Sequence, residues 1–394
     1  MVDFTTANNA LKTVYLGVLS DVLNLKTNPL FAKIKQLSKG VYGKEIKVLA
    51  PVGVNGGICA TGETDELPRV TNGGYVNLTS TLKNLYGRIE ISDKAIRASQ
   101  SSAGAFVNLL NDEMERLIEA STFNLSRMLY GDGRGLITEI TSIGTDKKTF
   151  TVKNAHAFVE GMVVELYDNN SSAFVENGKN LLVTAVDRAS GTVKIDKEFT
   201  ITDVADGGYY FVMQNSFKNE ITGVDALFNA GITTLYGLAK ANYPFIKGRD
   251  KSSFGTMTEI GIISEIDTTE NNTGAPIDFI SCSPKVRRKY QSILIDAKRP
   301  IQTMDIEGGF KALDFYGKPL VSDRLIKEDT MYLLNTKNFA LHQLCDWEWM
   351  SDESGNILTQ KAGYAAYTAT LVKYADLICT TPYGQARLSG ITLS

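Results

Sequence analysis

Histidine and cysteine are the residue types that most readily perform acid–base, nucleophilic or metal chemistry, and both are scarce in this sequence. The only two histidines are His156 and His342. Because histidine is the usual proton shuttle at neutral pH, this scarcity removes the easiest catalytic mechanism without forbidding catalysis. His342 and Cys345 could begin a metal site, but structural zinc needs four ligands at close spacing and no second pair lies nearby. We therefore predict neither a metal nor a cofactor.

The cysteines are far apart in the sequence and form no CxxC pair, so a disulfide framework is not expected. Reduced thiols in a cytoplasmic compartment are the simpler interpretation. The four residues are Cys59, Cys282, Cys345 and Cys379.

Acidic residues and a glycine-rich loop offer two further sites for chemistry. An acid–base pair could come from Asp112, Glu113, Glu115 and Glu119. On a helix with an apolar stripe opposite, however, these acids more simply form the solvated or subunit-facing side. The GDGRG run at 131–135 could cradle a phosphate, but phosphate loops precede helices and this run follows one. We interpret it as a helix C-cap and hinge, with Gly131 and Gly133 in left-handed conformations.

Basic and aromatic clusters complete the candidate sites. The basic cluster contains Lys285, Arg287, Arg288 and Lys289. A DNA-facing role, a solvated face and pairing with acids on a neighbour all remain open for it. The aromatic residues Trp347, Trp349 and Tyr374 could form a sugar platform, although core or interface anchors are the default. Nothing assembles a nucleophile, a base and oxyanion donors.

Composition sets the class of protein. With 394 residues the chain is expected to form about two or three domains. Hydrophobic residues make up 43% and charged residues 22%, which excludes disorder for the bulk of the chain. The net charge of −3 argues against a protein whose main function is to bind nucleic acid. No apolar run approaches the roughly 20 residues that span a bilayer, and we see no secretory signal at the N-terminus.

The first 92 residues predict an arm and a long hairpin. Apolar residues within 10–24 lie at helical spacing, and one stripe on a short helix must pack on the rest of the chain or on a neighbour. A turn is expected at Asn28-Pro29. Residues 45–92 alternate like two strands around a polar, glycine-rich tip, and such a hairpin again needs a partner surface.

A long helix from Ser102 to Tyr130 is the strongest local signal. Its apolar residues keep helical spacing, Ser102 can cap its start, and the following glycines can end it. It would be roughly 40 Å long at 1.5 Å per residue, which is typical of a structural strut.

The remainder reads as α+β. Short strand-like runs separated by turn residues at 136–215 predict an inserted β-barrel or sandwich. Beyond it we expect a helix at 256–267, a buried strand that ends at Ser283-Pro284, a helix that starts there with proline in its first position, and several strands.

This order of arm, hairpin, long helix, mixed domain and return strand resembles the major capsid proteins of tailed phages, which have the Hong Kong 97-type fold. Three segments support the resemblance: EITGVDALFNAG with TTLYGLAKANYPF in 220–245, APIDFISCSPKVRRKYQ in 275–291, and the run from FYGKPLVSD onward in 315–350. It covers nearly the whole chain outside the insertion, and it lies in the order of elements more than in any one motif.

The resemblance implies an α+β Hong Kong 97-like fold with an inserted small β domain. In order along the chain, it implies an N-terminal arm at 1–44, an E-loop at 45–97, a spine helix at 98–135, the inserted β-barrel-like domain at 136–215, a peripheral segment at 216–249, an axial domain at 250–355 and C-terminal peripheral strands at 356–394.

The implied function is self-assembly, without enzymatic activity, into the icosahedral head shell that encloses double-stranded DNA. The implied partners are further copies, in hexamers and pentamers, with a portal protein; no membrane is involved, and the shell is assembled in the host cytoplasm. Since Met1 almost directly precedes the arm, we expect any scaffold to be a separate protein. No lysine occurs between Cys59 and Val70, which makes the isopeptide cross-links of some relatives doubtful.

The candidate subunit-interface residues lie on the arm, the hairpin tip and the long helix: Leu11, Tyr15, Leu19, Thr64, Asp65, Glu66, Arg69, Glu115 and Glu119. Two alternatives stay open. An encapsulin-like nanocompartment would share the fold but hold protein cargo, and a soluble α+β hydrolase would have a discrete pocket and remain a monomer.

Overall fold

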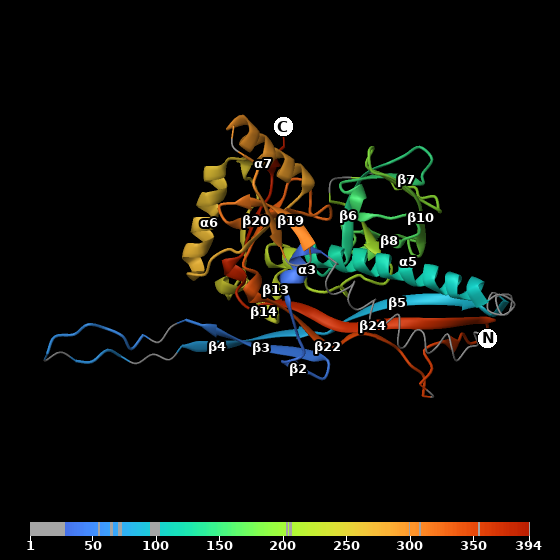
Figure 1. Ribbon diagram of the computed structural model, residues 1–394, viewed down its shortest axis with the longest axis horizontal. Helices are drawn as coiled ribbons and strands as arrows, with labels where there is room; N and C mark the ends of the chain where they lie inside the picture. Colours follow the sequence, from blue (N-terminus) through green and yellow to red (C-terminus); the bar gives the residue numbers. More distant parts are fainter. Residues whose placement is uncertain are drawn as a thin grey trace.

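A long twisted sheet with a projecting hairpin lies beneath a second sheet and a small barrel in the computed structural model (Figure 1). The structure describes residues 28–53, 56–63, 66–69, 73–94, 103–201, 204, 207–298, 300–306, 309–353 and 355–393, with 103–112 as backbone only. No helix in these ranges is long and apolar enough to cross a membrane.

The lower sheet is built around the longest strand, β24, which pairs antiparallel with β22, β23 and β5. The edge strand β1 pairs parallel with β22. The bounds are β1 Lys35–Leu37, β5 Lys83–Ser92, β22 Phe339–Trp349, β23 Thr359–Gln360 and β24 Ala366–Cys379.

The predicted long helix is α5, Ala103–Tyr130, and it lies over β5. Its inner face buries Met114, Leu125 and Leu129. Gly87 permits this close packing, since a Cβ there would lie 2.8 Å from Leu117 Cδ1. The helix ends as predicted at Tyr130, although the left-handed glycines that follow are 133 and 135 instead of the predicted Gly131.

The predicted hairpin is confirmed, but its second strand is two elements. β3 (Glu45–Val52) pairs antiparallel with β4 (Gly74–Thr81), and at Leu82 the chain leaves that pairing and continues as β5 beside β24. The hairpin is therefore a direct extension of the body's sheet. A short strand, β2 (Val41–Tyr42), pairs with the base of β3.

Residues 28–44, which we assigned to the arm, pack on their own chain. Asn28 caps α3 (Pro29–Lys33) by accepting a hydrogen bond from the Phe31 amide, 2.7 Å. Leu30 and Phe31 are buried in the main core, and β1 follows at once. This helix replaces the turn predicted at Asn28-Pro29. The helix predicted within 10–24 lies outside the described residues.

The upper sheet has seven strands in the order β15-β25-β21-β17-β20-β19-β18. One of its faces packs with α6 and α7 into a separate apolar cluster. α7 begins as predicted, because the Ser283 hydroxyl accepts from the Val286 amide and proline follows. α6 is displaced from the predicted 256–267, because Thr258 is the residue that caps it. The bounds are β15 Arg249–Lys251, α6 Glu259–Thr273, β17 Phe279–Cys282, α7 Pro284–Asp296, β18 Thr303–Ile306, β19 Phe310–Phe315, β20 Lys318–Ser322, β21 Met331–Leu334 and β25 Ala386–Leu388.

The insertion forms a closed antiparallel barrel with a core of its own, built around Phe150, Phe158 and Phe211. Its strands follow the order β10-β11-β7-β6-β12-β8-β9, and pairing of β10 with β8 closes the ring. The bounds are β6 Leu136–Ile143, β7 Thr149–Val152, β8 Val163–Asp168, β9 Ala173–Phe174, β10 Leu181–Asp187, β11 Thr192–Ile195 and β12 Tyr209–Met213.

Short elements complete the connections: η2 Ala155–Ala157, η3 Val224–Leu227, β13 Thr234–Leu235, β14 Leu238–Ala239, η4 Pro244–Ile246, β16 Gly255–Thr256, η6 Thr336–Asn338, η7 Pro382–Gly384 and β26 Ile391–Thr392.

Candidate functional site

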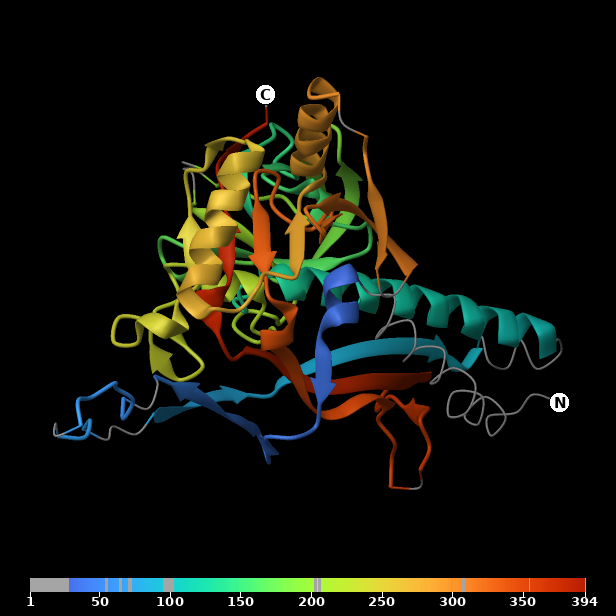
Figure 2. The ribbon, with the colours of Figure 1, turned by 60° about the vertical axis from the view of Figure 1, so that its left-hand side comes forward.

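The hairpin β3–β4 projects from the body (Figures 1 and 2). Several of its apolar side chains are exposed to solvent. Leu49 lies opposite Asn77 and Pro51 opposite Tyr75, so these four residues share one face of the ribbon. On that face Leu49 is 57% exposed and Tyr75 is 68% exposed. Exposed apolar residues gathered on one projecting element are typical of a protein–protein contact surface.

The opposite face of the hairpin is bound to the body. Ile46, Ala50 and Leu78 are buried there. The Thr79 amide also donates to the Tyr236 carbonyl, 2.9 Å, which ties the edge of β4 to the β13–β14 turn. The base of the hairpin is thus fixed, while its outer face stays open.

A buried carboxylate joins the hairpin to the lower sheet. Asp376 Oδ1 accepts from the amides of Thr222 (2.6 Å) and Leu377 (2.9 Å). Its Oδ2 accepts from the hydroxyls of Ser80, in β4, and Thr222. Burial raises the pKa of Asp376 above its ordinary value of 3.8, although these hydrogen bonds and Lys83 oppose the rise. Three segments distant in sequence therefore meet at one side chain.

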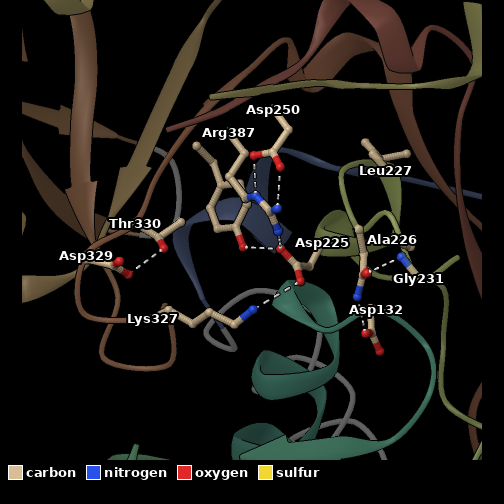
Figure 3. A network of polar contacts seen from close by, with 12 residues as sticks. Asp132, Asp225, Ala226, Leu227, Gly231, Asp250, Lys327, Asp329, Thr330 and Arg387 are labelled. Carbon is tan, nitrogen blue, oxygen red and sulfur yellow. Dashed lines mark hydrogen bonds and ion pairs between the residues drawn. The ribbon is translucent and has the colours of Figure 1, made fainter. Parts of the chain in front are cut away.

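A second polar network fastens the upper sheet to the segment that follows the barrel (Figure 3). Asp225, in η3, accepts from Arg387 Nη1 (2.6 Å) and from the Tyr332 hydroxyl (2.9 Å), and its Oδ2 lies 3.4 Å from Lys327 Nζ. The same Arg387 donates from Nε and Nη2 to both oxygens of Asp250, 2.9 and 2.8 Å. Such bidentate pairs fix orientation as well as distance.

Nearby positive charges keep the buried carboxylate of Asp225 ionised. Burial alone would raise the pKa of Asp225, but the cations of Lys327 and Arg387 outweigh it, so the pKa is lowered. For Arg387, burial acts to lower the pKa, and the carboxylates of Asp250 and Asp225 raise it overall. The network therefore holds η3 against the strands β15, β21 and β25 of the upper sheet.

The end of α5 is tied to the segment that follows the barrel and to the upper sheet. Arg127 and Glu220 form an ion pair in which both side chains are buried. One turn later, the hydroxyls of Tyr130 and Ser281 lie 2.7 Å apart, and the Tyr130 ring stacks on Tyr332. These contacts join the end of α5 to the upper sheet and to the segment that follows the barrel.

The predicted interface residues are not gathered into one site within a single chain. Glu66 and Arg69 are exposed near the hairpin tip, and Glu115 and Glu119 are exposed on α5. The others, Leu11, Tyr15, Leu19, Thr64 and Asp65, lie outside the described residues. Their roles in contacts between copies remain predictions.

The alternative sites give little support for enzymatic chemistry. His342 Nδ1 lies 2.8 Å from the Lys39 carbonyl, and the residues that the structure describes contain no group of three or more His, Cys, Asp or Glu able to hold a metal. Trp347 and Trp349 are 5% and 7% exposed, which confirms them as core residues and removes the sugar platform.

Sequence reasoning missed the residues of both polar networks. Asp225, Asp250 and Arg387 are far apart in the chain and match no motif. One signal was available for Asp376, because a charged residue stands within the apolar run ADLIC of a predicted strand. Buried charges are rare unless they are paired or hydrogen-bonded.

Comparisons with known proteins bear on this architecture. No protein-family model and no curated protein matches the chain. Among solved structures, the capsid asymmetric unit of cyanophage A-1(L) matches with a TM-score of 0.55 and 12% sequence identity, covering 96% of this chain and 93% of that one. The chain has the fold of a phage capsid subunit. The predicted Hong Kong 97-type α+β fold is therefore confirmed.

Two further matches have TM-scores below 0.5. One is Mycobacterium phage Bobi, at 0.46 with 9% identity, covering 92% of this chain and 90% of that one. The other is the holo-SrpI encapsulin complex of Synechococcus elongatus, at 0.43 with 10% identity, covering 93% and 89%.

Proposed function

We propose that this chain is a major capsid protein that assembles into the icosahedral head shell around the double-stranded DNA of a tailed phage. One observation carries the proposal. On a fold shared with a phage capsid subunit, a hairpin leaves the body with its apolar outer face uncovered. An isolated chain gains nothing from exposed Leu49 and Tyr75, whereas a neighbouring copy can bury them.

The parts of the fold are assigned accordingly. The hairpin is the E-loop, α5 is the spine helix, the lower sheet belongs to the peripheral domain, and the upper sheet with α6 and α7 is the axial domain. The barrel is an added domain. The buried, hydrogen-bonded carboxylates Asp225 and Asp376 support this assignment, because a shell subunit must hold its shape under load.

Partners and location follow from the same proposal. Further copies form hexamers and pentamers, a separate scaffolding protein and a portal protein take part in assembly, and the chain is part of the virion after assembly in the host cytoplasm. The net charge of −3 suits a shell that encloses DNA without binding it tightly or reading its sequence. The protein has no enzymatic activity in this proposal.

The test is expression of the chain, alone and with candidate scaffold, followed by electron microscopy. We expect closed shells that protect DNA from nuclease when the phage packaging system is present. Shells that hold a protein cargo instead would support a nanocompartment, and a stable monomer under every condition would contradict both.

The hairpin itself is tested by charge on its outer face. The double variant Leu49→Asp/Tyr75→Asp should stay folded, because both side chains are exposed, and should lose closed shells. Leu182→Asp is the matched control, since Leu182 is a 42% exposed leucine on the barrel. Normal shells from the double variant would show that this face is not a contact.

A further inference from the structure

The helices α6 and α7 carry opposite net charge, and the exposed charged residues on them include Asp267 of α6 and Lys285 and Arg288 of α7. α6 has four acids, Glu259, Glu265, Asp267 and Glu270, and no base. α7 has four bases, Lys285, Arg287, Arg288 and Lys289, and one acid, Asp296. Two surfaces of one chain with opposite charge are what a head-to-tail contact between copies requires.

Three of these charges form ion pairs within the chain. Glu265 pairs with Arg249 and Glu270 with Lys318. On the other helix, Lys285 pairs with Glu328. Within the described residues, exposed Asp267 and exposed Arg288 take part in no ion pair.

Each helix also exposes one isoleucine on the same stripe as its unpaired charge. Along α6 the exposed stripe is Ile260, Ser264, Asp267 and Asn271, and along α7 it is Lys285, Arg288, Ser292 and Ile295. Ile260 is 80% exposed and Ile295 is 62% exposed. Buried residues such as Ile262 and Val286 occupy the faces turned to the sheet.

The two stripes match when they run in opposite directions. Ile260 then faces Ile295, Ser264 faces Ser292, Asp267 faces Arg288 and Asn271 faces Lys285. In both helices the isoleucine and the unpaired charge are seven residues apart, about 10 Å along the axis. The serines between them let two helices approach closely.

The two helices are also placed to meet different neighbours. α6 packs near β25 and α7 near β20, which are separated by β21 and β17 in the sheet order. Figure 2 shows them on different flanks of this sheet. On the face that both helices cover, a copy can therefore offer α6 near β25 to one neighbour and α7 near β20 to the other.

We propose that the α6 stripe of one copy packs antiparallel on the α7 stripe of the next copy around each capsomer ring. This rests on the proposed shell function and names a contact within it. Because each copy uses a different surface toward each neighbour, the contact is heterologous and closes by rotation.

Charge reversal and rescue test the contact. The test is made under conditions in which the wild-type chain forms shells. Asp267→Arg and Arg288→Asp should each lower the assembled fraction about tenfold at low salt, because the same like-charge contact then recurs around every ring. The double variant Asp267→Arg/Arg288→Asp should recover wild-type assembly. Glu176→Arg, an exposed acid of the barrel, is the charge-matched control and should assemble normally.

A cysteine pair tests the geometry without depending on closed shells. Ser264→Cys/Ser292→Cys, in a chain with exposed Cys59 replaced by serine, should give on oxidation a cross-linked ladder that ends at a ring. A ladder that ends at the dimer would indicate a two-fold contact and overturn the ring. If the single charge-reversal variants assembled like the wild type, the contact would be overturned, while the proposed shell function would stand. If Arg288→Asp formed normal shells that lacked DNA, α7 would instead be assigned to contact with the genome, and the contact between copies would again be overturned.

Discussion

At the scale of single residues, the Asp225 network shows which charges the fold depends on. Replacing Asp225 by asparagine leaves Arg387 with only Asp250 and removes the carboxylate that Lys327 faces. Because removal of one partner from a buried pair costs about 3–5 kcal/mol, we expect a loss near the lower bound, since Asp250 remains. Lys327→Ala is the control and should cost less than about 1 kcal/mol, because that side chain is 67% exposed. Urea unfolding of unassembled subunits measures both, and equal losses would contradict the argument.

Asp376 differs from Asp225 in that its pKa is raised, and this predicts that the stability of the fold depends on pH. Its pKa is raised by burial, so ionisation in the folded state costs stability as the pH rises from 3.8 through the folded pKa. In the variant Asp376→Asn, the new side chain would keep an oxygen for the amides of Thr222 and Leu377, and its amide could donate to the hydroxyls of Ser80 and Thr222. This variant should therefore match or exceed wild-type stability at pH 7, and the difference should shrink as the pH falls toward 3.8.

Thermal unfolding of unassembled subunits at several pH values tests this. Asp376→Ala serves as the comparison, because it leaves two buried amides without an acceptor and should destabilise at every pH. An asparagine variant much weaker than wild type at neutral pH would show that the ionised form is the stable one.

Sequence could not predict these residues, for a physical reason. Asp225 and Arg387 come together only when η3 meets the edge of the upper sheet, and this long-range contact leaves no periodicity in the chain. Local rules did predict what depends on neighbours in sequence. Ser283 and the proline after it fix the start of α7 within one turn of helix.

At the scale of elements, the sequence predicts the type of an element, helix or strand, more accurately than it predicts the partner of that element. The alternating run 75–92 forms the two strands β4 and β5, and nothing in the local sequence marks the change of partner at Leu82 between them. There the Leu82 amide donates to the Lys44 carbonyl, 3.0 Å, and the chain passes from hairpin to body sheet. The partner is decided by β24, which lies almost 300 residues later.

The packing of α3 could not be predicted for the same reason. Composition alone could not show that Leu30 and Phe31 belong to the main core, because the strands that bury them come from the other end of the chain. β1 reaches that core by pairing parallel with β22. Deletion of residues 1–40 would therefore remove Leu30 and Phe31 from the main core and expose it, and would not only shorten the N-terminal arm.

At the scale of the whole molecule, the barrel stands as a separate unit, and its separateness can be tested. Its core is distinct from the two other apolar clusters, and its two connections meet: the Lys218 amide donates to the Arg134 carbonyl, 2.9 Å. Aromatic contacts cross the boundary, since the Phe217 ring packs on Tyr167 at 4.4 Å and on Phe174 at 5.6 Å between ring centroids. The physical boundary therefore lies beyond 215, after Phe217.

We expect residues 136–218 to fold alone, with cooperative thermal unfolding and dispersed amide resonances. The rest of the chain, with 136–215 replaced by a linker of about three glycine and serine residues and with Phe217→Ser, should keep its own unfolding transition, because the junction is already closed and no aromatic ring is left exposed. The same excision without Phe217→Ser is the control and should aggregate more readily. If the excised chain failed to fold both with and without Phe217→Ser, the barrel would be required for the rest of the subunit to fold, and it would not be a separate unit.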